Sequence, residues 1–253
     1  MVKVVVNGAL GRMGQRILAC AADDGGVSVA GAVDLQGHEG TPQVTTDLGA
    51  TLGSADVVID FTSHVGVPAT IEIVSKAKKA LVVGTTGLTR DEQAALDRAA
   101  KQVPIVYAPN MSVGVNLLFQ LVGQVAKTLG DAYDVEIVEA HHNQKKDAPS
   151  GTARRLAENI AAALGRDLAR DGVYGREGIV GARGSNEIGI HAVRAGDIVG
   201  EHTVIFAGPS ERIELTHRAH SRDVFARGAL RAAKWVVGKA PGLYSMLDVL
   251  GLA

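Results

Sequence analysis

The fold can be predicted outward from residues 1–14, MVKVVVNGALGRMG. The run Val2–Val6 is rich in β-branched residues and is typical of a strand that is covered on both faces. Three glycines with the spacing G-x-x-G-x-x-G follow it, and residues 11–22 then carry apolar side chains at helical spacing. A strand, a glycine turn and a helix in this order predict the start of an α/β fold with a parallel sheet.

Strand-like and helical segments continue to alternate as far as residue 112. Helices are predicted around residues 67–78 and 91–101. The further apolar runs are predicted strands, at Val27–Val33, Val57–Phe61, Leu81–Val83 and Val103–Val106. Because strands that alternate with helices indicate a parallel sheet with right-handed crossovers, we expect a Rossmann-like N-terminal domain.

The order of elements changes after residue 112. A helix over residues 112–129, a strand over 133–140 and a helix over 152–164 are predicted, followed by a long glycine- and arginine-rich loop at 167–184. Three strand candidates with turn signals between them then follow, at residues 187–194, 203–206 and 212–217. Because they run almost together, we expect them to pair antiparallel, in an α+β C-terminal domain with a mixed or antiparallel sheet. A last helix, residues 221–239, is expected to return to the first domain.

Composition and charge exclude several classes of partner. A formal net charge of −1 gives no field that would attract nucleic acid or acidic lipid. No apolar run reaches the ~20 residues of a membrane span, and the first residues lack a signal-peptide layout. Cys20 is the only cysteine, so it cannot form an internal disulfide, and we expect it to be a buried structural thiol. A cytoplasmic protein with a small-molecule substrate is expected.

The glycine turn Gly8–Gly14 predicts a dinucleotide site. Glycines allow the backbone to approach a pyrophosphate, and the helix start offers unpaired N–H groups. Asp34 ends the second predicted strand about 20 residues later, where a carboxylate can bind the adenosine ribose. The alternative is a glycine turn that serves only close packing of strand and helix. Asp34 repels a 2′-phosphate and is followed by Leu35, so NADH is preferred over NADPH, although Arg12 could still meet a phosphate.

Two further polar segments follow the fourth and fifth predicted strands. They are Gly84-Thr85-Thr86-Gly87 and Ala108-Pro109-Asn110-Met111. Ligands of parallel sheets gather at the carboxyl ends of the strands, so contacts with the nicotinamide half of the cofactor are expected here. Ordinary turn chemistry is the alternative, because these residue types also favour turns.

The segment Glu136–Ala153 is the most chemically distinctive part of the sequence. A strand leads into His141, His142 and Lys145, and a helix begins near Ser150-Gly151-Thr152. Backbone N–H groups at such a helix start bind carboxylate or phosphate, and a histidine can act as a general acid near neutral pH. Pro149 is expected in the first helical turn, with Asp147 or Ser150 as the N-cap. The segment therefore predicts a site for an anionic substrate with a proton donor.

Three other interpretations of this segment remain. The two histidines and Glu139 could bind a metal ion, but no further ligands complete such a site, and none is expected. The polar residues could form only a solvated loop and a helix cap. The pair Lys145-Lys146 could be surface charge.

The whole segment Glu136–Ala153 also resembles, without a mismatch, the signature of the 4-hydroxy-tetrahydrodipicolinate (dihydrodipicolinate) reductase family. The resemblance covers nearly the whole chain. It extends to the Gly8–Gly14 turn, Asp60-Phe61-Thr62, Gly84–Gly87, Asn110–Asn116 and Arg194–His202.

The resemblance implies roles for individual residues. His141 would be the proton donor, Lys145 the catalytic lysine and His142 a substrate-binding residue, and Ser150, Gly151 and Thr152 would bind a substrate carboxylate. Cofactor contacts would be made by Gly8, Ala9, Leu10, Gly11, Arg12, Met13, Asp34, Gly84, Thr85, Thr86, Ala108, Pro109, Asn110 and Met111. Some members have arginines, which favour NADP, at the positions of Leu35 and Ser63. An aromatic residue is common at the position of Met111.

The resulting hypothesis is an NAD(P)H-dependent oxidoreductase of diaminopimelate and lysine biosynthesis. It would reduce 4-hydroxy-tetrahydrodipicolinate, through its dehydrated imine, to tetrahydrodipicolinate. Residues 1–111 and 221–253 would form the dinucleotide-binding domain. Residues 112–220 would bind substrate and, as the resemblance implies, build a homotetramer.

Two alternatives are another NAD-dependent imine or amino-acid dehydrogenase and a non-catalytic sensor of nicotinamide redox state. The remaining histidines are expected to be structural. His64 could approach the cofactor, and His202 is expected to form satisfied hydrogen bonds.

Overall fold

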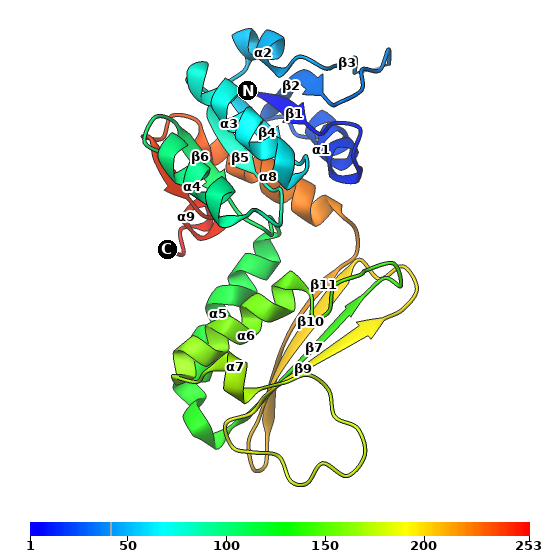
Figure 1. Ribbon diagram of the computed structural model, residues 1–253, viewed down its shortest axis with the longest axis vertical. Helices are drawn as coiled ribbons and strands as arrows, with labels where there is room; N and C mark the ends of the chain where they lie inside the picture. Colours follow the sequence, from blue (N-terminus) through cyan, green and yellow to red (C-terminus); the bar gives the residue numbers. More distant parts are fainter. Residues whose placement is uncertain (41) are drawn as a thin grey trace. The chain divides into compact units, whose positions relative to one another are not determined.

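The computed structural model describes residues 1–40 and 42–253, which form two compact units (Figure 1). Unit 1 contains Met1–Val113 and Arg222–Ala253, and unit 2 contains Gly114–Ser221. No helix among the described residues is both long and apolar enough to cross a membrane.

Unit 1 contains a seven-stranded sheet in the order β12-β6-β5-β4-β1-β2-β3, in which every pair is parallel. The strand order reverses between β1 and β4, which is where ligands of such sheets bind. The strands are β1 (Val2–Asn7), β2 (Val27–Val33), β3 (Val44–Thr45), β4 (Val57–Asp60), β5 (Ala80–Val83), β6 (Pro104–Tyr107) and β12 (Gly242–Tyr244). The predicted Rossmann-like parallel sheet is confirmed.

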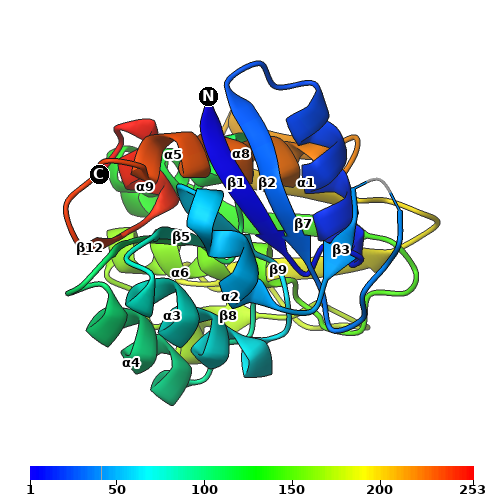
Figure 2. The ribbon, with the colours of Figure 1, turned by 90° about the horizontal axis from the view of Figure 1, so that it is seen from above.

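Helices cover both faces of this sheet (Figure 2). One face carries α1 (Arg12–Ala22), α8 (Asp223–Val236) and α9 (Met246–Leu250). The other carries α2 (Leu48–Thr51), α3 (Val67–Lys76) and α4 (Arg90–Ala99), with the 3₁₀ turns η1 (Leu52–Ser54) and η2 (His64–Gly66). Val4 and Val6 are buried in the first core and Val5 in the second, which explains why β1 is an unbroken apolar run. Cys20 is buried in the first core, as expected.

Unit 2 contains a five-stranded sheet in the order β11-β10-β7-β9-β8. Its strands are β7 (Asp134–His141), β8 (Gly172–Val173), β9 (Ile188–Arg194), β10 (Gly200–Ala207) and β11 (Arg212–Ala219). Its helices are α5 (Val113–Leu129), α6 (Gly151–Leu164) and α7 (Leu168–Asp171), with the 3₁₀ turn η3 (Gly130–Ala132). β10 is antiparallel to β7 and β11, whereas β9 is parallel to β7 and β8, so the sheet is mixed.

The predicted antiparallel pairing of the last three strands is wrong for β9. β7 lies between β9 and β10, so β9 and β10 are not neighbours. The turn after β9 has the composition of a hairpin, but its backbone pairs with the end of β7 and the residues just after it. Ala195 N donates to His141 O, and Asn143 N donates to Gly196 O. Local turn chemistry cannot reveal a partner strand that lies about fifty residues earlier. The segment 167–184 is also not only a loop, since it contains α7 and β8.

The two faces of the unit 2 sheet differ. Figure 1 shows α5 and α6 along one face, where Val135 and Ile137 of β7 pack with Leu156 and Ile160 of α6. Successive strand residues point to opposite faces, so Glu136 and Val138 lie on the other face. Within the described residues no helix covers that second face, which we call the open face.

Candidate active site

The glycine turn and Asp34 meet in unit 1. Gly8 N and Ala9 N both donate to Val33 O at 2.9 Å, and Leu10 N donates to Asp34 Oδ2 at 2.8 Å. Gly8 has φ +85°, which favours glycine. A Cβ at Gly14 would lie 2.1 Å from Gly8 O, so α1 can approach the turn only without a side chain there. Both the close packing and the acidic partner are therefore present.

Asp60 links the carboxyl ends of three neighbouring strands. Its carboxylate is fully buried and accepts hydrogen bonds from Asn7 Nδ2 at 2.9 Å, Thr85 Oγ1 at 2.7 Å and Thr70 Oγ1 at 2.9 Å. Thr62 adds its N–H and its hydroxyl. Asn7 ends β1, Asp60 ends β4 and Thr85 follows β5, so this carboxylate fixes the loops at the point where the strand order reverses. The sequence pointed to Asp60 only through the family resemblance.

The segment that follows β6 is mainly packed into unit 1. Ala108 and Met111 are buried, and Met111 belongs to the core that includes α1 and α8. Asn110 Oδ1 accepts a hydrogen bond from Ser112 N at 2.9 Å. The side chain of Met111 therefore contributes packing. Among Ala108–Met111, Pro109 is the residue that is exposed to solvent.

Unit 2 brings the other predicted residues together at the end of β7. Glu139 is fully buried and receives four hydrogen bonds: from His141 Nδ1 at 2.6 Å, from Ser150 N at 2.9 Å, and from both terminal nitrogens of Arg194 at 2.7 Å each. Burial raises the pKa of Glu139, but the donors outweigh it and lower that pKa to about 2. Glu139 is therefore ionised at neutral pH.

The helix α6 begins at Gly151 and Ser150 is its N-cap. Ser150 Oγ accepts a hydrogen bond from Ala153 N at 3.1 Å. The expectation that Pro149 lies in the first helical turn is wrong, because the chain still has an extended conformation at Ser150 (φ −61°, ψ 153°). Gly151 is exposed and Thr152 is partly exposed in the first turn.

His202 lies behind this helix start. Its Nε2 is 3.1 Å from Ser150 Oγ, and its ring meets that of His141 edge to face at 5.2 Å between centroids. Burial, aided by nearby His141, lowers the pKa of His202 to about 3, so it is neutral at pH 7. The expected hydrogen bond of His202 is confirmed at Nε2, while its buried Nδ1 has no partner among the described residues.

Of the remaining predicted residues, His142 and Lys145 lie between β7 and α6, and His64 lies in unit 1. Lys145 Nζ pairs with Asp147 Oδ1 at 2.8 Å, and Lys145 N donates to His142 O at 3.1 Å. His142 and Lys145 are both partly exposed. His64 pairs with Glu92 at 3.0 Å on the outside of unit 1.

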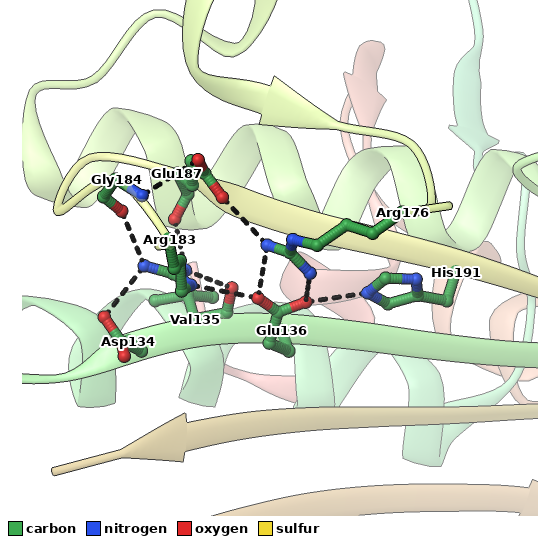
Figure 3. Close-up of polar contacts among 8 residues, drawn as sticks. All are labelled: Asp134, Val135, Glu136, Arg176, Arg183, Gly184, Glu187 and His191. Carbon is green, nitrogen blue, oxygen red and sulfur yellow. Dashed lines mark hydrogen bonds and ion pairs between the residues drawn. The ribbon is translucent and has the colours of Figure 1, made fainter. Parts of the chain in front are cut away.

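A second cluster, on the open face, was not predicted (Figure 3). Glu136 Oε1 accepts hydrogen bonds from Arg176 at 2.9 Å and from Arg183 at 3.0 Å, and Glu136 Oε2 lies 2.7 Å from His191 Nε2. Arg176 also pairs with Glu187. We call Glu136, Arg176, Arg183, Glu187 and His191 the open-face cluster.

Comparisons with known proteins cover both units. The chain matches the family model described as dihydrodipicolinate reductase, N-terminus, over residues 2–111, and the model described as dihydrodipicolinate reductase, C-terminus, over residues 114–250. The chain belongs to the dihydrodipicolinate reductase family. The predicted resemblance is confirmed, and membership of this reductase family makes the protein an oxidoreductase.

Individual members of the dihydrodipicolinate reductase family agree with the chain over its full length. It is 54% identical to the 4-hydroxy-tetrahydrodipicolinate reductase of Geobacter metallireducens and 53% identical to that of Geobacter sulfurreducens, each covering 100% of both chains. It also resembles the dipicolinate-bound dihydrodipicolinate reductase from Paenisporosarcina sp. TG-14, with TM-score 0.80, 26% identity and 98% of each chain covered.

Proposed function

We propose that this protein reduces 4-hydroxy-tetrahydrodipicolinate, through its dehydrated imine, to tetrahydrodipicolinate with NAD(P)H, in diaminopimelate and lysine biosynthesis. The observation that supports this most strongly is the full-length identity of 54% to a relative that carries the name of this activity. The bound dipicolinate of the Paenisporosarcina structure supports a small cyclic dicarboxylate as the class of substrate.

The residues of unit 1 fit a nicotinamide dinucleotide. The start of α1 has no side-chain cap and no acidic residue in its first turn, so its N–H groups suit a pyrophosphate. The candidate contacts are Gly8–Met13, Asp34, Gly84–Thr86 and Ala108–Met111. When bound, the reduced nicotinamide supplies a hydride to the conjugated imine.

We propose NADH as the preferred form. The carboxylate of Asp34 lies at the glycine turn, where a 2′-phosphate would meet its negative charge. Leu35 beside it is 95% exposed and offers no positive charge to such a phosphate. The ratio of kcat/KM for NADH to that for NADPH is expected to exceed one, although Arg12 in the same turn limits the margin.

In unit 2 the proposed roles follow from hydrogen bonds. The carboxylate of Glu139 only accepts, so Nδ1 of His141 must donate, and Nε2 is the nitrogen that can release a proton. That proton balances the electron density that hydride addition leaves on the substrate, and water then restores it to His141. Lys145, His142 and the N–H groups of Gly151 and Thr152 would hold the carboxylates. Ser150 lies beside them as the N-cap, and its own N–H donates to Glu139.

The decisive experiment is NADH oxidation with freshly generated 4-hydroxy-tetrahydrodipicolinate. Turnover by the wild type, with a large loss in Lys145→Ala, is expected. Turnover only with other imines or amino acids would favour a different dehydrogenase, and no turnover with any of them would contradict the proposal. We further propose a cytoplasmic homotetramer built through unit 2, which light scattering coupled to size exclusion would test.

A further inference from the structure

The ion pair of Glu139 and Arg194 has contacts beyond the pair itself. Arg194 donates from both terminal nitrogens to the two oxygens of Glu139, the bidentate geometry of strong carboxylate recognition. Each oxygen of Glu139 then accepts one further hydrogen bond: Oε2 from His141 Nδ1 at 2.6 Å and Oε1 from Ser150 N at 2.9 Å. One carboxylate therefore joins the proposed proton donor to the start of the proposed carboxylate site.

Arg194 extends the same network to the loop that carries Lys145. Its Nη2 donates to Asp147 O at 2.7 Å, and the side chain of Asp147 pairs with Lys145 at 2.8 Å. The ion pair of Glu139 and Arg194 thus fixes four segments: the ends of β7 and β9, the loop between β7 and α6, and the start of α6. Arg194 pairs with His141 in register across the parallel strands β7 and β9, which places its guanidinium beside the histidine.

We propose that Glu139 and Arg194 are positioning residues of the reductase reaction. They hold His141 with its proton on Nδ1 and its Nε2 directed away from Glu139, and they fix the start of α6 relative to His141. This inference rests on the proposed function. Glu139 is fully buried, so it acts through His141 and Ser150 and does not touch substrate. Arg194 keeps the carboxylate ionised and therefore purely an acceptor.

A merely structural ion pair is the competing explanation. Buried ion pairs add little net stability compared with apolar residues of similar size, so stability alone gives no reason for charges at this position. The two explanations differ in what a charge-neutral replacement does. If the pair is only structural, removing both charges together restores the protein completely.

The test uses Glu139→Gln, the double variant Glu139→Gln with Arg194→Met, and Glu136→Gln as a matched control on the opposite face of the same strand. A glutamine offers one acceptor and one donor, so it cannot accept from both His141 and Ser150 while facing Arg194. We expect kcat to fall by about 10- to 100-fold in Glu139→Gln, the range for lost supporting hydrogen bonds. Glu136→Gln should stay within about twofold of the wild type, a difference within the usual spread of single surface changes.

The double variant separates positioning from stability. It leaves no unpaired buried charge, so its urea midpoint should recover towards the wild type even if Glu139→Gln alone folds poorly. Its kcat should remain as low as in Glu139→Gln. Recovery of kcat together with stability would overturn the proposal.

A spectroscopic readout makes the test independent of turnover. The ¹⁵N shifts of the His141 ring report which nitrogen of the neutral imidazole carries the proton. We expect Nδ1–H in the wild type and a substantial Nε2–H population in Glu139→Gln, with Glu136→Gln like the wild type. If wild-type enzyme fails to turn over the proposed substrate but the tautomer shifts, the proposed function fails and the positioning stands. An unchanged tautomer would overturn the positioning whatever the activity.

Discussion

Glu136 and Glu139 lie three residues apart on β7 and have similar partners, yet they stand on opposite faces of the sheet. Each carboxylate receives hydrogen bonds from arginine and histidine. Burial raises the pKa of each, and the donors outweigh it, so both pKa values are lowered to about 2. The side chain of Glu136 is 22% exposed and that of Glu139 is fully buried.

The two glutamates differ in what their partners do. The arginines of the open-face cluster come from the segment between β8 and β9, so that cluster fixes a loop to the sheet (Figure 3). Glu139 instead fixes a histidine and a helix start that carry the proposed chemistry. The same side-chain chemistry thus serves different purposes, and the two-residue period of the strand decides which face each serves.

The largest expected difference concerns the two histidines. His141→Gln removes the proposed proton donor, so kcat should fall by about 10²- to 10⁴-fold, the usual contribution of general acid catalysis. His191→Gln, the matching change beside Glu136, should leave kcat within about twofold. Stopped-flow or steady-state NADH oxidation measures both, and equal losses in the two variants would contradict the division of roles between the faces.

The next difference concerns stability. Arg194→Met leaves the fully buried Glu139 without its bidentate partner and should lower the free energy of unfolding by about 3–5 kcal/mol. Arg176→Met should cost about 1 kcal/mol or less, because Glu136 is more exposed and keeps Arg183 and His191. Urea unfolding at pH 7 compares the two. A larger cost for Arg176→Met would reverse the assignment of the buried and the exposed pair.

As pH falls, the free energy of unfolding should first lose the contribution of His202 and then those of Glu136 and Glu139. The pKa of His202 is lowered to about 3 by burial, so the stability it contributes is present above about pH 6.5 and is lost as pH falls towards 3. The lowered pKa values of Glu136 and Glu139 contribute stability that is present above about pH 4.5 and is lost as pH falls through about 2. Each carboxylate contributes roughly 3 kcal/mol at most.

Glu136→Gln isolates one carboxylate in that experiment. It should flatten the decline of unfolding free energy between about pH 4.5 and 3 and leave the decline above pH 4.5 unchanged, since the latter includes His202. Urea unfolding at several pH values measures this. An identical slope in wild type and variant below pH 4.5 would show that Glu136 is not the titrating group.

The smallest expected effects involve one glycine on each face. A Cβ at Gly189 would lie 1.7 Å from Glu136 Oε2, so Gly189→Ala should displace that carboxylate and cost about 1–3 kcal/mol of stability with kcat preserved. A Cβ at Gly200 would lie 3.1 Å from His141 Nε2, so Gly200→Ala should lower kcat by roughly 2- to 10-fold with little change in stability, because small misplacements of a reacting group affect rate. Thermal unfolding and steady-state kinetics on both variants test this crossed pattern.

The sequence predicted features that depend on neighbouring residues. Strand β1, the glycine turn and the helix that follows it are local patterns, and the adjacency of Asp34 to the turn follows from the strand–helix–strand order. Short edge strands such as β3 and β12 have too few residues to show a period. The position of β9 beside β7 could not be inferred, because no local signal specifies a parallel partner.

The candidate site shows the same limit. Ser150 as N-cap and the loop with Lys145 follow from local residue types. Pro149 was expected inside the first helical turn but lies directly before the N-cap, because both it and Ser150 suit a helix start. The pairing of Glu139 with Arg194 joins residues 55 positions apart and appears only when the register of β7 and β9 is known. Asp60 and Asn7 are separated by 53 positions in the same way.

Unit 1 is assembled from two separated stretches of chain, whereas unit 2 is continuous. During synthesis on the ribosome, all of residues 114–221 are translated before α8 and β12. Until then the sheet of unit 1 lacks its edge strand beside β6 and the buried face of α8, including Leu230. The residues of the unit 2 sheet are therefore all synthesised before those of the unit 1 sheet are complete, although more than a hundred residues of unit 1 precede unit 2 in the chain.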